Sequence, residues 1–430
     1  MIDRLLKLLD ASTCNFLAAE AITGELEKAG FQRLLMKDKW ELKPNGKYYV
    51  TKNSSAVFAF VCGTKNPAEA GFNIIASHSD SPCFKIKPNA EIVGDGGVVK
   101  LNVEKYGGGI LYTWFDRPLS ISGRVMLRGK DPLHPEERLV DLKRPVATIP
   151  HLAIHFNRAV NEGNPLSVQQ DMLPVIGYYT PAELQEMREH GGAVKMMVAK
   201  HLGIAPEEIM EYELNLYPLE PAQLVGEHNE YFQSGRIDDL SMAFASLEAM
   251  LAACDKTSET TRVMAVFDNE ETGSGTKQGA HSPILSTIFM RLCGSYEDYA
   301  RAIDRSFMIS ADDAHAWHPN YNSKYDPTNH PVMGGGPCVK INANCKYMTD
   351  AEGAAVFRSL CDNAGVECQY FVNHSDVAGG STLGNILTGQ LDLRGVDMGC
   401  PIWAMHSARE TAAVGDQEAT VRVFTYFYSL

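Results

Sequence analysis

A short apolar run that ends in two adjacent carboxylates constrains the fold of this chain more than any other feature. The run covers residues 262–267, Asp268 and Asn269 follow it, and Glu270 and Glu271 come shortly before a Gly-Ser-Gly stretch. The run predicts a buried strand, and the polar residues predict that it ends in a loop. Side chains alternate along a strand, but at its end both can turn into one cleft. One carboxylate can then bind a metal ion while the other transfers a proton.

Three further predicted strands also end in acidic or imidazole side chains. They lead into His78, into Asp312 and into His406. Ligands of open α/β sheets bind beyond the carboxyl ends of the strands, so these side chains are expected to meet there. A fifth candidate, Asp238, lies where a helix is predicted to begin. Two imidazoles with several carboxylates suit Zn²⁺, or Mn²⁺ and Co²⁺, and one shared carboxylate fits two such ions.

Each of these groups also has an ordinary structural explanation. The alternatives are a strand-end turn with a capping Asp80 after His78, a helix N-cap at Asp238, a solvated acid pair at Glu270 and Glu271, an Asx turn at Asp312 and Asp313, and a hydrogen-bonded core histidine at His406. We favour the functional interpretation because the same placement at a strand end recurs several times.

The length of 430 residues and a change of pattern along the chain predict two domains. Between about residues 87 and 231, alternating segments predict antiparallel strands, with one helix over 181–200. After Asp238, helices and short strands alternate, which is typical of an α/β fold. Two sequential domains would also fit. We favour a discontinuous α/β domain, residues 1–86 and 232–430, interrupted by a mixed, mostly β insertion at 87–231, because His78 and the later residues must meet.

Charge and composition exclude some classes of partner. The net charge is −14, which argues against nucleic acid or an anionic membrane surface as a partner. The first ten residues lack the apolar run of a signal peptide, and no stretch reaches the roughly 18 apolar residues of a membrane span. Ten cysteines are scattered without a Cys-x-x-Cys pair. A reduced, cytoplasmic setting is the simplest expectation.

Eight segments spread over the chain carry a family resemblance. They are His78–Pro82, Tyr106–Gly109, Thr113–Leu119, Ile149–His155, Phe267–Glu271, Ser310–Asp312, His318–Tyr321 and Met405–Glu410. On these motifs the chain resembles the M18 metallo-aminopeptidases, the aspartyl aminopeptidase family, over essentially its whole length. The resemblance implies a three-layer α/β/α metallopeptidase domain with an inserted mixed, mostly β dimerisation domain.

The resemblance also implies a role for each acid and imidazole. His78 and Asp312 would hold one metal ion, Glu271 and His406 the other, and Asp238 both; Glu270 would be the general base for the bridging water, and Asp80 would hydrogen-bond to His78 and fix its tautomer. The two ions would be zinc, with manganese or cobalt as alternatives.

Further implications of the resemblance concern assembly and substrate. His155 would reach the active site of a neighbouring chain and stabilise the oxyanion, within a homodimer that builds a tetrahedral homododecamer. The residues alone favour another interpretation, in which His151 and His155 share one face of a helix. Lys340 occupies the position that would bind an acidic side chain of the substrate, although an ordinary strand lysine also fits.

Two departures from the family pattern affect these assignments. Asp313 follows Asp312 where an apolar residue is usual, so the metal ligand could be misassigned by one position; the Ser-Ala-Asp match favours Asp312. Asn373 to Asp376 repeats the His-Ser-Asp pattern of the first motif, and we expect His374 to be a third-shell or substrate-facing group rather than a metal ligand. The glycine-rich segment 379–384 lacks the ending of a P-loop and is expected to line the cleft.

The predicted function is therefore metal-dependent removal of the N-terminal residue, expected to be Asp or Glu, from peptides. One alternative keeps the two metal ions but acts as a carboxypeptidase or amide hydrolase, which must grip a carboxylate, usually with Arg. Another is a non-catalytic assembly protein. The intact set of metal-ligand residues argues against the second alternative.

Overall fold

The computed structural model describes all residues from Met1 to Leu430. Contacts separate two units: Met1–Asp80 with Ala222–Met405 and Glu410–Leu430, and Ser81–Pro221 with His406–Arg409. The predicted insertion at 87–231 therefore begins and ends later than the second unit. The reason is strand pairing, because Cys83 already pairs within the sheet of the second unit and Gln223 within a sheet of the first.

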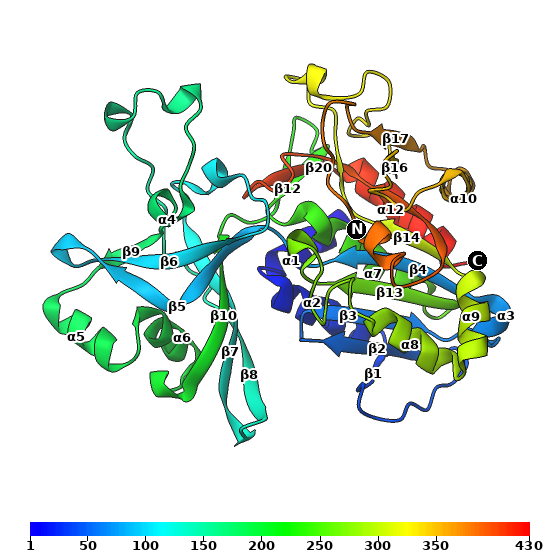
Figure 1. The fold of residues 1–430 in the computed structure, drawn as a ribbon, viewed down its shortest axis with the longest axis horizontal. Coiled ribbons are helices and arrows are strands. Elements are labelled where there is room, and N and C mark those ends of the chain that lie inside the picture. Colours follow the sequence, from blue (N-terminus) through cyan, green and yellow to red (C-terminus); the bar gives the residue numbers. More distant parts are fainter. The chain divides into compact units, whose positions relative to one another are not determined.

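The first unit is built on a nine-stranded sheet (Figure 1). Four neighbouring central strands, β13, β4, β14 and β18, are parallel to one another. Their carboxyl ends therefore lie at the same edge of the sheet. In spatial order the strands are β1 (Gln32–Arg33), β2 (Lys47–Lys52), β3 (Ala56–Val61), β13 (Thr261–Phe267), β4 (Phe72–His78), β14 (Phe307–Ala311), β18 (Arg394–Gly399), β16 (Cys338–Ile341) and β17 (Gln369–Val372).

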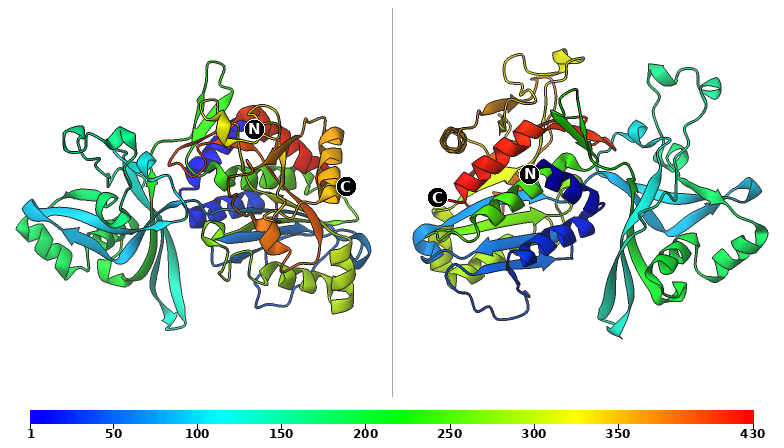
Figure 2. Two further views of the ribbon diagram at one scale, coloured as in Figure 1. Left: turned by 45° about the horizontal axis from the view of Figure 1, so that its top comes forward. Right: turned by 180° about the vertical axis from the view of Figure 1, so that it is seen from behind.

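Helices cover both faces of this sheet (Figure 2). On β4, Ile75 packs into one core, whereas Ile74 and Ala76 pack into the other, because successive side chains of a strand point to opposite faces. The first core includes α1 (Ile2–Ala11), α2 (Asn15–Lys28), α7 (Ile237–Ala253), α10 (Ala351–Ala364) and α12 (Val414–Phe427); the second includes α8 (Ile284–Cys293), α9 (Tyr296–Asp304) and α11 (Leu383–Leu387). The unit is thus a three-layer α/β/α domain.

A second, smaller sheet completes the first unit. Its strands, in spatial order, are β11 (Gln223–Val225), β12 (Tyr231–Ser234), β20 (Glu410–Ala413), β19 (Pro401–Trp403) and β15 (Ala314–His315). β15 follows β14 after only two residues, so this sheet shares a chain segment with the carboxyl edge of the large sheet. The remaining short elements are α3 (Pro67–Ala70), η6 (Glu270–Thr272) and η7 (Asn322–Lys324).

The second unit is mostly β structure around its own core. Its six-stranded antiparallel sheet runs β8 (His134–Asp141), β7 (Leu119–Asp131), β10 (Ile209–Pro218), β5 (Cys83–Val93), β6 (Val98–Tyr106) and β9 (Val175–Tyr178). Its helical elements are α4 (Val168–Asp171), α5 (Pro181–Glu189), α6 (Ala193–Leu202), η1 (Asp95–Gly97), η2 (Leu111–Trp114), η3 (Ile154–Phe156), η4 (Val160–Glu162) and η5 (Pro206–Glu208).

The single helix expected over 181–200 is wrong, because the structure has two helices there. Gly191 and Gly192 separate α5 from α6, with φ of 78° and 113°. Glycine adopts these left-handed values without steric cost, so the pair ends one helix and redirects the chain. Elsewhere, none of the ten cysteines forms a disulfide bond. No helix has both the length and the apolar character needed to cross a bilayer.

Candidate metal centre

The parallel strands bring several of the predicted site residues to one edge of the large sheet. His78 is the last residue of β4 and lies opposite Phe267, the last residue of β13, so Glu270 follows close by. β14 also runs parallel to β4, with Ser310 opposite Ala76, and Asp312 directly follows that strand. Strand register alone therefore carries these side chains to the same edge, as the sequence predicted.

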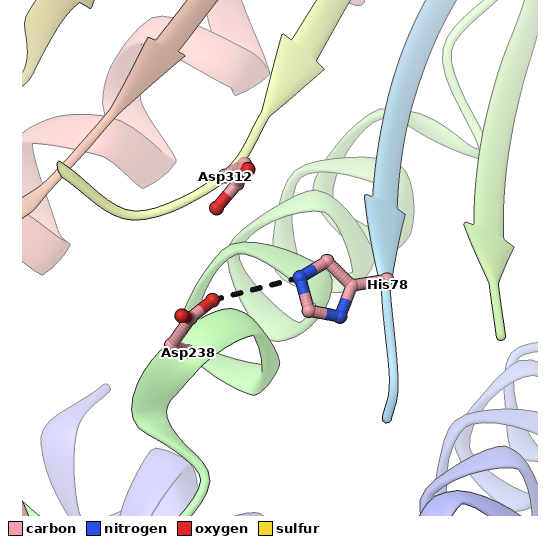
Figure 3. A group of neighbouring side chains, drawn as sticks. All are labelled: His78, Asp238 and Asp312. Atoms are coloured by element: carbon pink, nitrogen blue, oxygen red, sulfur yellow. Dashed lines mark ion pairs between the residues drawn. The ribbon is translucent and has the colours of Figure 1, made fainter. Parts of the chain in front are cut away.

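His78, Asp238 and Asp312 point toward one another at this edge (Figure 3). One potential ligand atom from each lies within 4.8 Å of the others, and all three side chains are buried. His78 Nε2 lies 3.5 Å from Asp238 Oδ1. Two buried carboxylates so close together are costly unless a positive charge lies between them. One imidazole with two carboxylates suits Zn²⁺, Mn²⁺ or Co²⁺, so these residues fit a divalent cation.

Asp238 is held in place by the start of α7. Glu410 Oε2 accepts hydrogen bonds from the backbone N–H groups of Ile237, at 2.7 Å, and of Asp238, at 3.1 Å. A carboxylate on these otherwise unsatisfied donors stabilises the first turn of a helix. Arg236, the residue before α7, has a left-handed φ of 63°, and its Nε donates to the carbonyl of Ser12 at 2.9 Å. These contacts fix the backbone at Asp238 and so fix the position from which its carboxylate extends.

Two aspartates hold His78 in place, one at its ring and one at its backbone. Its Nδ1 lies 3.0 Å from the carbonyl oxygen of Asp80 and 3.3 Å from Asp80 Oδ1, so the proton belongs on Nδ1 and the lone pair on Nε2. Its backbone N–H donates to Asp239 Oδ2 at 3.0 Å. Burial opposes protonation of the ring, but the carboxylates of Asp238 and Asp80 raise the His78 pKa well above its ordinary value. The same negative field favours a bound cation.

Asp80 also holds the turn that carries the adjacent glutamates. Its Oδ1 accepts from the backbone N–H of Glu270 at 3.1 Å, and its Oδ2 accepts from that of Glu271 at 3.2 Å. Asn269, just before them, has a left-handed φ of 61°. Burial raises the pKa of Glu270 to about 8; His78 opposes this shift, and the neighbouring carboxylates add to it. A carboxylate whose pKa lies near neutrality is suited to transferring protons.

Asp312 and Asp313 have different surroundings despite their adjacency. Asp312 groups with His78 and Asp238, whereas Asp313 groups with Asp238 and Asp239. Asp313 Oδ2 accepts a hydrogen bond from the Ser241 hydroxyl at 2.6 Å. Of these two aspartates, only Asp312 belongs to a group that contains an imidazole, that of His78. A glycine is needed at position 399, since a Cβ there would lie 2.0 Å from the backbone oxygen of Asp312.

Lys340, the predicted partner for an acidic substrate, is buried on β16. Its Nζ lies 3.6 Å from Asp312 Oδ2. Burial alone would lower the lysine pKa, but Asp312 and other nearby groups raise it above its ordinary value, so the side chain is an ammonium. The pKa of Asp312 is raised by burial, with Lys340 opposing the shift. Lys340 thus places a positive charge beside a predicted metal ligand.

His406 belongs to the second unit, with the segment His406–Arg409. Its Nδ1 lies 3.3 Å from the carbonyl oxygen of Gly108, and its own carbonyl accepts from Ile110 N at 2.9 Å. Donation to Gly108 puts the proton on Nδ1 and the lone pair on Nε2, as in a metal-binding histidine. Because the positions of the two units relative to one another are not determined (Figure 1), the pairing of His406 with Asp238 and Glu271 stays a prediction.

His155 lies in η3 of the second unit and is exposed. The expectation that His151 and His155 share a helix face is wrong. Ile149 forms an isolated bridge with Phe115, and the backbone N–H of His151 donates to Asp116 Oδ1 at 3.0 Å, so the chain is not helical before η3. The spacing of four residues had indicated a helix, but Pro150 and these long-range contacts override it.

A family model described as Aminopeptidase I zinc metalloprotease (M18) matches residues 8–428. The chain belongs to the M18 family. Its relatives include a probable M18 family aminopeptidase 2 of Clostridium novyi, 44% identical over 432 residues that cover 100% of this chain and 98% of that protein. The protein of the same description from Pseudomonas aeruginosa is 40% identical and covers 99% and 97%. The predicted family and the predicted class of enzyme, a metallo-aminopeptidase, are confirmed.

Solved structures confirm the predicted fold class of this M18 aminopeptidase. The Ape4 and Nbr1 complex matches with a TM-score of 0.94 at 34% identity, over 99% of this chain and 84% of that one. The mApe1 dodecamer of S. cerevisiae matches with a TM-score of 0.86 at 25% identity, over 99% and 96%. Both matches extend over the α/β/α domain and the mostly β insertion together.

Two residues that support the centre of this M18 aminopeptidase were not predicted. Asp239 accepts from the backbone of His78, and Glu410 caps α7 beside Asp238. Both are buried. The one sequence feature that pointed to Asp239 as a site residue was its position next to Asp238. Glu410 ended the Met405–Glu410 motif, but nothing in that motif indicated its partner, since it caps a backbone 172 residues away in sequence.

Proposed function

We propose that this M18 aminopeptidase removes an acidic first residue, Asp or Glu, from peptides, using two divalent cations and Glu270 as general base. The observation that carries the proposal is the convergence of His78, Asp238 and Asp312 at the sheet edge where Glu270 also lies. The description of the family as zinc metalloproteases supports zinc as the metal. His78 and Asp312 would hold one ion, Glu271 and His406 the other, and Asp238 both.

Each residue in this proposal has a defined task. A divalent cation held by these residues would supply a Lewis acid for the scissile carbonyl and would lower the pKa of the attacking water. The Glu270 carboxylate accepts a proton from that water and returns it to the leaving amine. Asp80 keeps Glu270 in position, because it binds the backbone of the glutamate turn and the ring of His78 together. Lys340 would attract the acidic side chain of the substrate, sharing its charge with Asp312.

The direct test compares aminoacyl anilides with and without an N-acetyl group. We expect the metal-loaded enzyme to hydrolyse Asp and Glu anilides, and blocking the amine to reduce kcat/KM by at least about 100-fold, because the free amine helps position the substrate. Chelation should abolish turnover, and adding back Zn²⁺, Mn²⁺ or Co²⁺ should restore it. Equal rates on blocked and free substrates would instead indicate an amide hydrolase.

We further propose that the second unit is a dimerisation domain that supplies His155 to a neighbouring chain, within a tetrahedral homododecamer. The surface around His155 supports this, since Leu152, Ile154 and Phe156 are 57%, 53% and 82% exposed. Apolar side chains so exposed on neighbouring positions are typical of a covered interface. The solved structure of a related dodecamer also supports a large assembly.

Mixed oligomers test whether His155 acts across the interface. His155→Ala and Glu270→Gln chains should each be nearly inactive alone. Co-expressed in equal amounts, they should recover roughly a quarter of wild-type activity, because each mixed dimer regains one complete site. In the matched control, a His151→Ala chain takes the place of the His155→Ala chain. The His151→Ala variant should be active when it is expressed alone. If the activity of the mixture does not exceed the summed activities of the two variants expressed alone, His155 does not act on a neighbouring chain.

A further inference from the structure

A pocket of about 380 Å³ lies in the first unit, apart from the groups that hold the metal centre together. Its lining includes three histidines, one lysine, two tyrosines and one asparagine. The polar and aromatic residues that form it are His315, His318, Tyr321, Lys324, Tyr325, Phe371, Asn373 and His374. This volume is enough for one or two amino-acid residues of a peptide.

The walls of the pocket continue directly from the metal centre. His315 belongs to β15 and follows Asp312 by three residues. Phe371 of β17, whose ring centroid lies 5.7 Å from that of His315, pairs in register with Lys340 of β16. Side chains of paired residues on neighbouring strands lie on the same face of a sheet, so Phe371 adjoins the buried Lys340–Asp312 pair. A peptide bound at the metal centre therefore has this pocket within reach.

The chemistry of the lining is unusual for this chain. The protein has 53 acidic and 39 basic residues, yet none of the residues that line the pocket is acidic. Lys324 brings a positive charge to its rim, and two phenols and an amide add hydrogen-bond donors. Asp376 lies beside the lining, with its Oδ2 3.9 Å from His374 Nδ1, but its side chain is 93% exposed to solvent. The lining thus offers a cation and several hydrogen-bond donors to a ligand, and no carboxylate that would repel an anion.

Local hydrogen bonds prepare several of these groups as donors. The backbone N–H of Asn320 donates to His318 Nδ1 at 3.2 Å, and that of Asp376 donates to His374 Nδ1 at 3.2 Å. A neutral imidazole that accepts at Nδ1 carries its proton on Nε2, so both rings offer an Nε2–H donor. The side-chain amide of Asn373 interacts with the Tyr347 phenol and also lines the pocket. An amide carries two N–H donors, so Asn373 adds a further donor to the lining.

We propose that this pocket binds a carboxylate of the peptide substrate, through Asn373, the Nε2–H groups of His318 and His374, and Lys324. The proposal rests on the proposed aminopeptidase function. The carboxylate has two possible sources: the acidic side chain of the first residue, or a carboxylate on the part of the peptide that leaves. In either case the pocket is a specificity site additional to Lys340.

Paired substrates that differ only in one carboxylate distinguish the two sources. Asp and Asn anilides test the side chain of the first residue, and dipeptides with a free or an amidated C-terminus test the leaving part. The variants are Asn373→Leu and Lys324→Met, with Lys346→Met as a control at an exposed lysine outside the pocket. Metal content and Tm are measured for each variant. Binding of L-aspartate and L-asparagine by calorimetry provides a readout that does not need turnover.

We expect each pocket variant to lower kcat/KM for the charged member of one pair by about tenfold, the cost of one lost charge-assisted hydrogen bond. The neutral member, the metal content and the Lys346→Met control should be unchanged. Unchanged ratios for both pairs, in both pocket variants, would overturn the proposal. An enzyme that hydrolyses none of the anilides or dipeptides, even before substitution, would contradict the proposed function instead, so the two failures are distinguishable.

Discussion

An Asp312→Asn variant should lose about one metal ion per chain and hydrolyse peptides on the order of 10³-fold more slowly. The reason is that Asp312 is one of only three side chains in this buried group, with His78 and Asp238. An amide has no charge to balance a divalent cation, and it binds such a cation far less strongly than a carboxylate. Metal content by plasma mass spectrometry and steady-state kinetics measure the two effects.

The neighbouring Asp313→Asn variant is the matched control. Its amide oxygen can still accept the hydrogen bond that Ser241 donates, at 2.6 Å in the wild-type protein. We expect it to keep its metal ions and most of its activity. If Asp313→Asn lost the metal while Asp312→Asn kept it, the assignment of the ligand would have to move by one residue.

The second large effect is expected for Glu270→Gln, which should keep both metal ions but lower kcat by about 10²–10⁴-fold. Glutamine has nearly the same shape, and the backbone N–H of residue 270 can still donate to Asp80. The turn should therefore persist, while the group that accepts the proton is lost. Because the substrate still binds, KM should change little. Metal analysis and kinetics on the same preparation separate this from a folding defect.

Glu271→Gln provides the contrast, because Glu271 is predicted to bind metal rather than to transfer a proton. That variant should lose metal as well as activity. The two adjacent glutamates would then have different roles, metal binding for Glu271 and proton transfer for Glu270. Near-normal turnover of Glu270→Gln with metal bound would defeat the assignment of the general base.

The parts of the site that were predictable are those that local sequence patterns determine. Apolar runs locate β4, β13 and β14, and parallel strands must end at a common edge, so His78, Glu270 and Asp312 could be brought together from the sequence. The separation of the insertion from the α/β domain followed from a change in periodicity. Its exact limits did not, because they depend on which strand pairs with which.

The parts that were missed depend on contacts between distant backbone segments. Glu410 caps α7 from 172 residues away, and no local pattern marks such a cap. The spacing of His151 and His155 indicated a helix, but the pairing of Ile149 with Phe115 extends the chain there. The break between α5 and α6 was visible at Gly191 and Gly192, yet the periodic residues on either side concealed it.

An anomalous difference map from crystals of the zinc-loaded protein tests the central claim most directly. The account predicts two peaks, each within about 2.0–2.3 Å of a carboxylate oxygen of Asp238, one also bound by His78 and the other by His406. A map with no peak beside Asp238, or with a single peak held by Asp239 and Asp313, would contradict it.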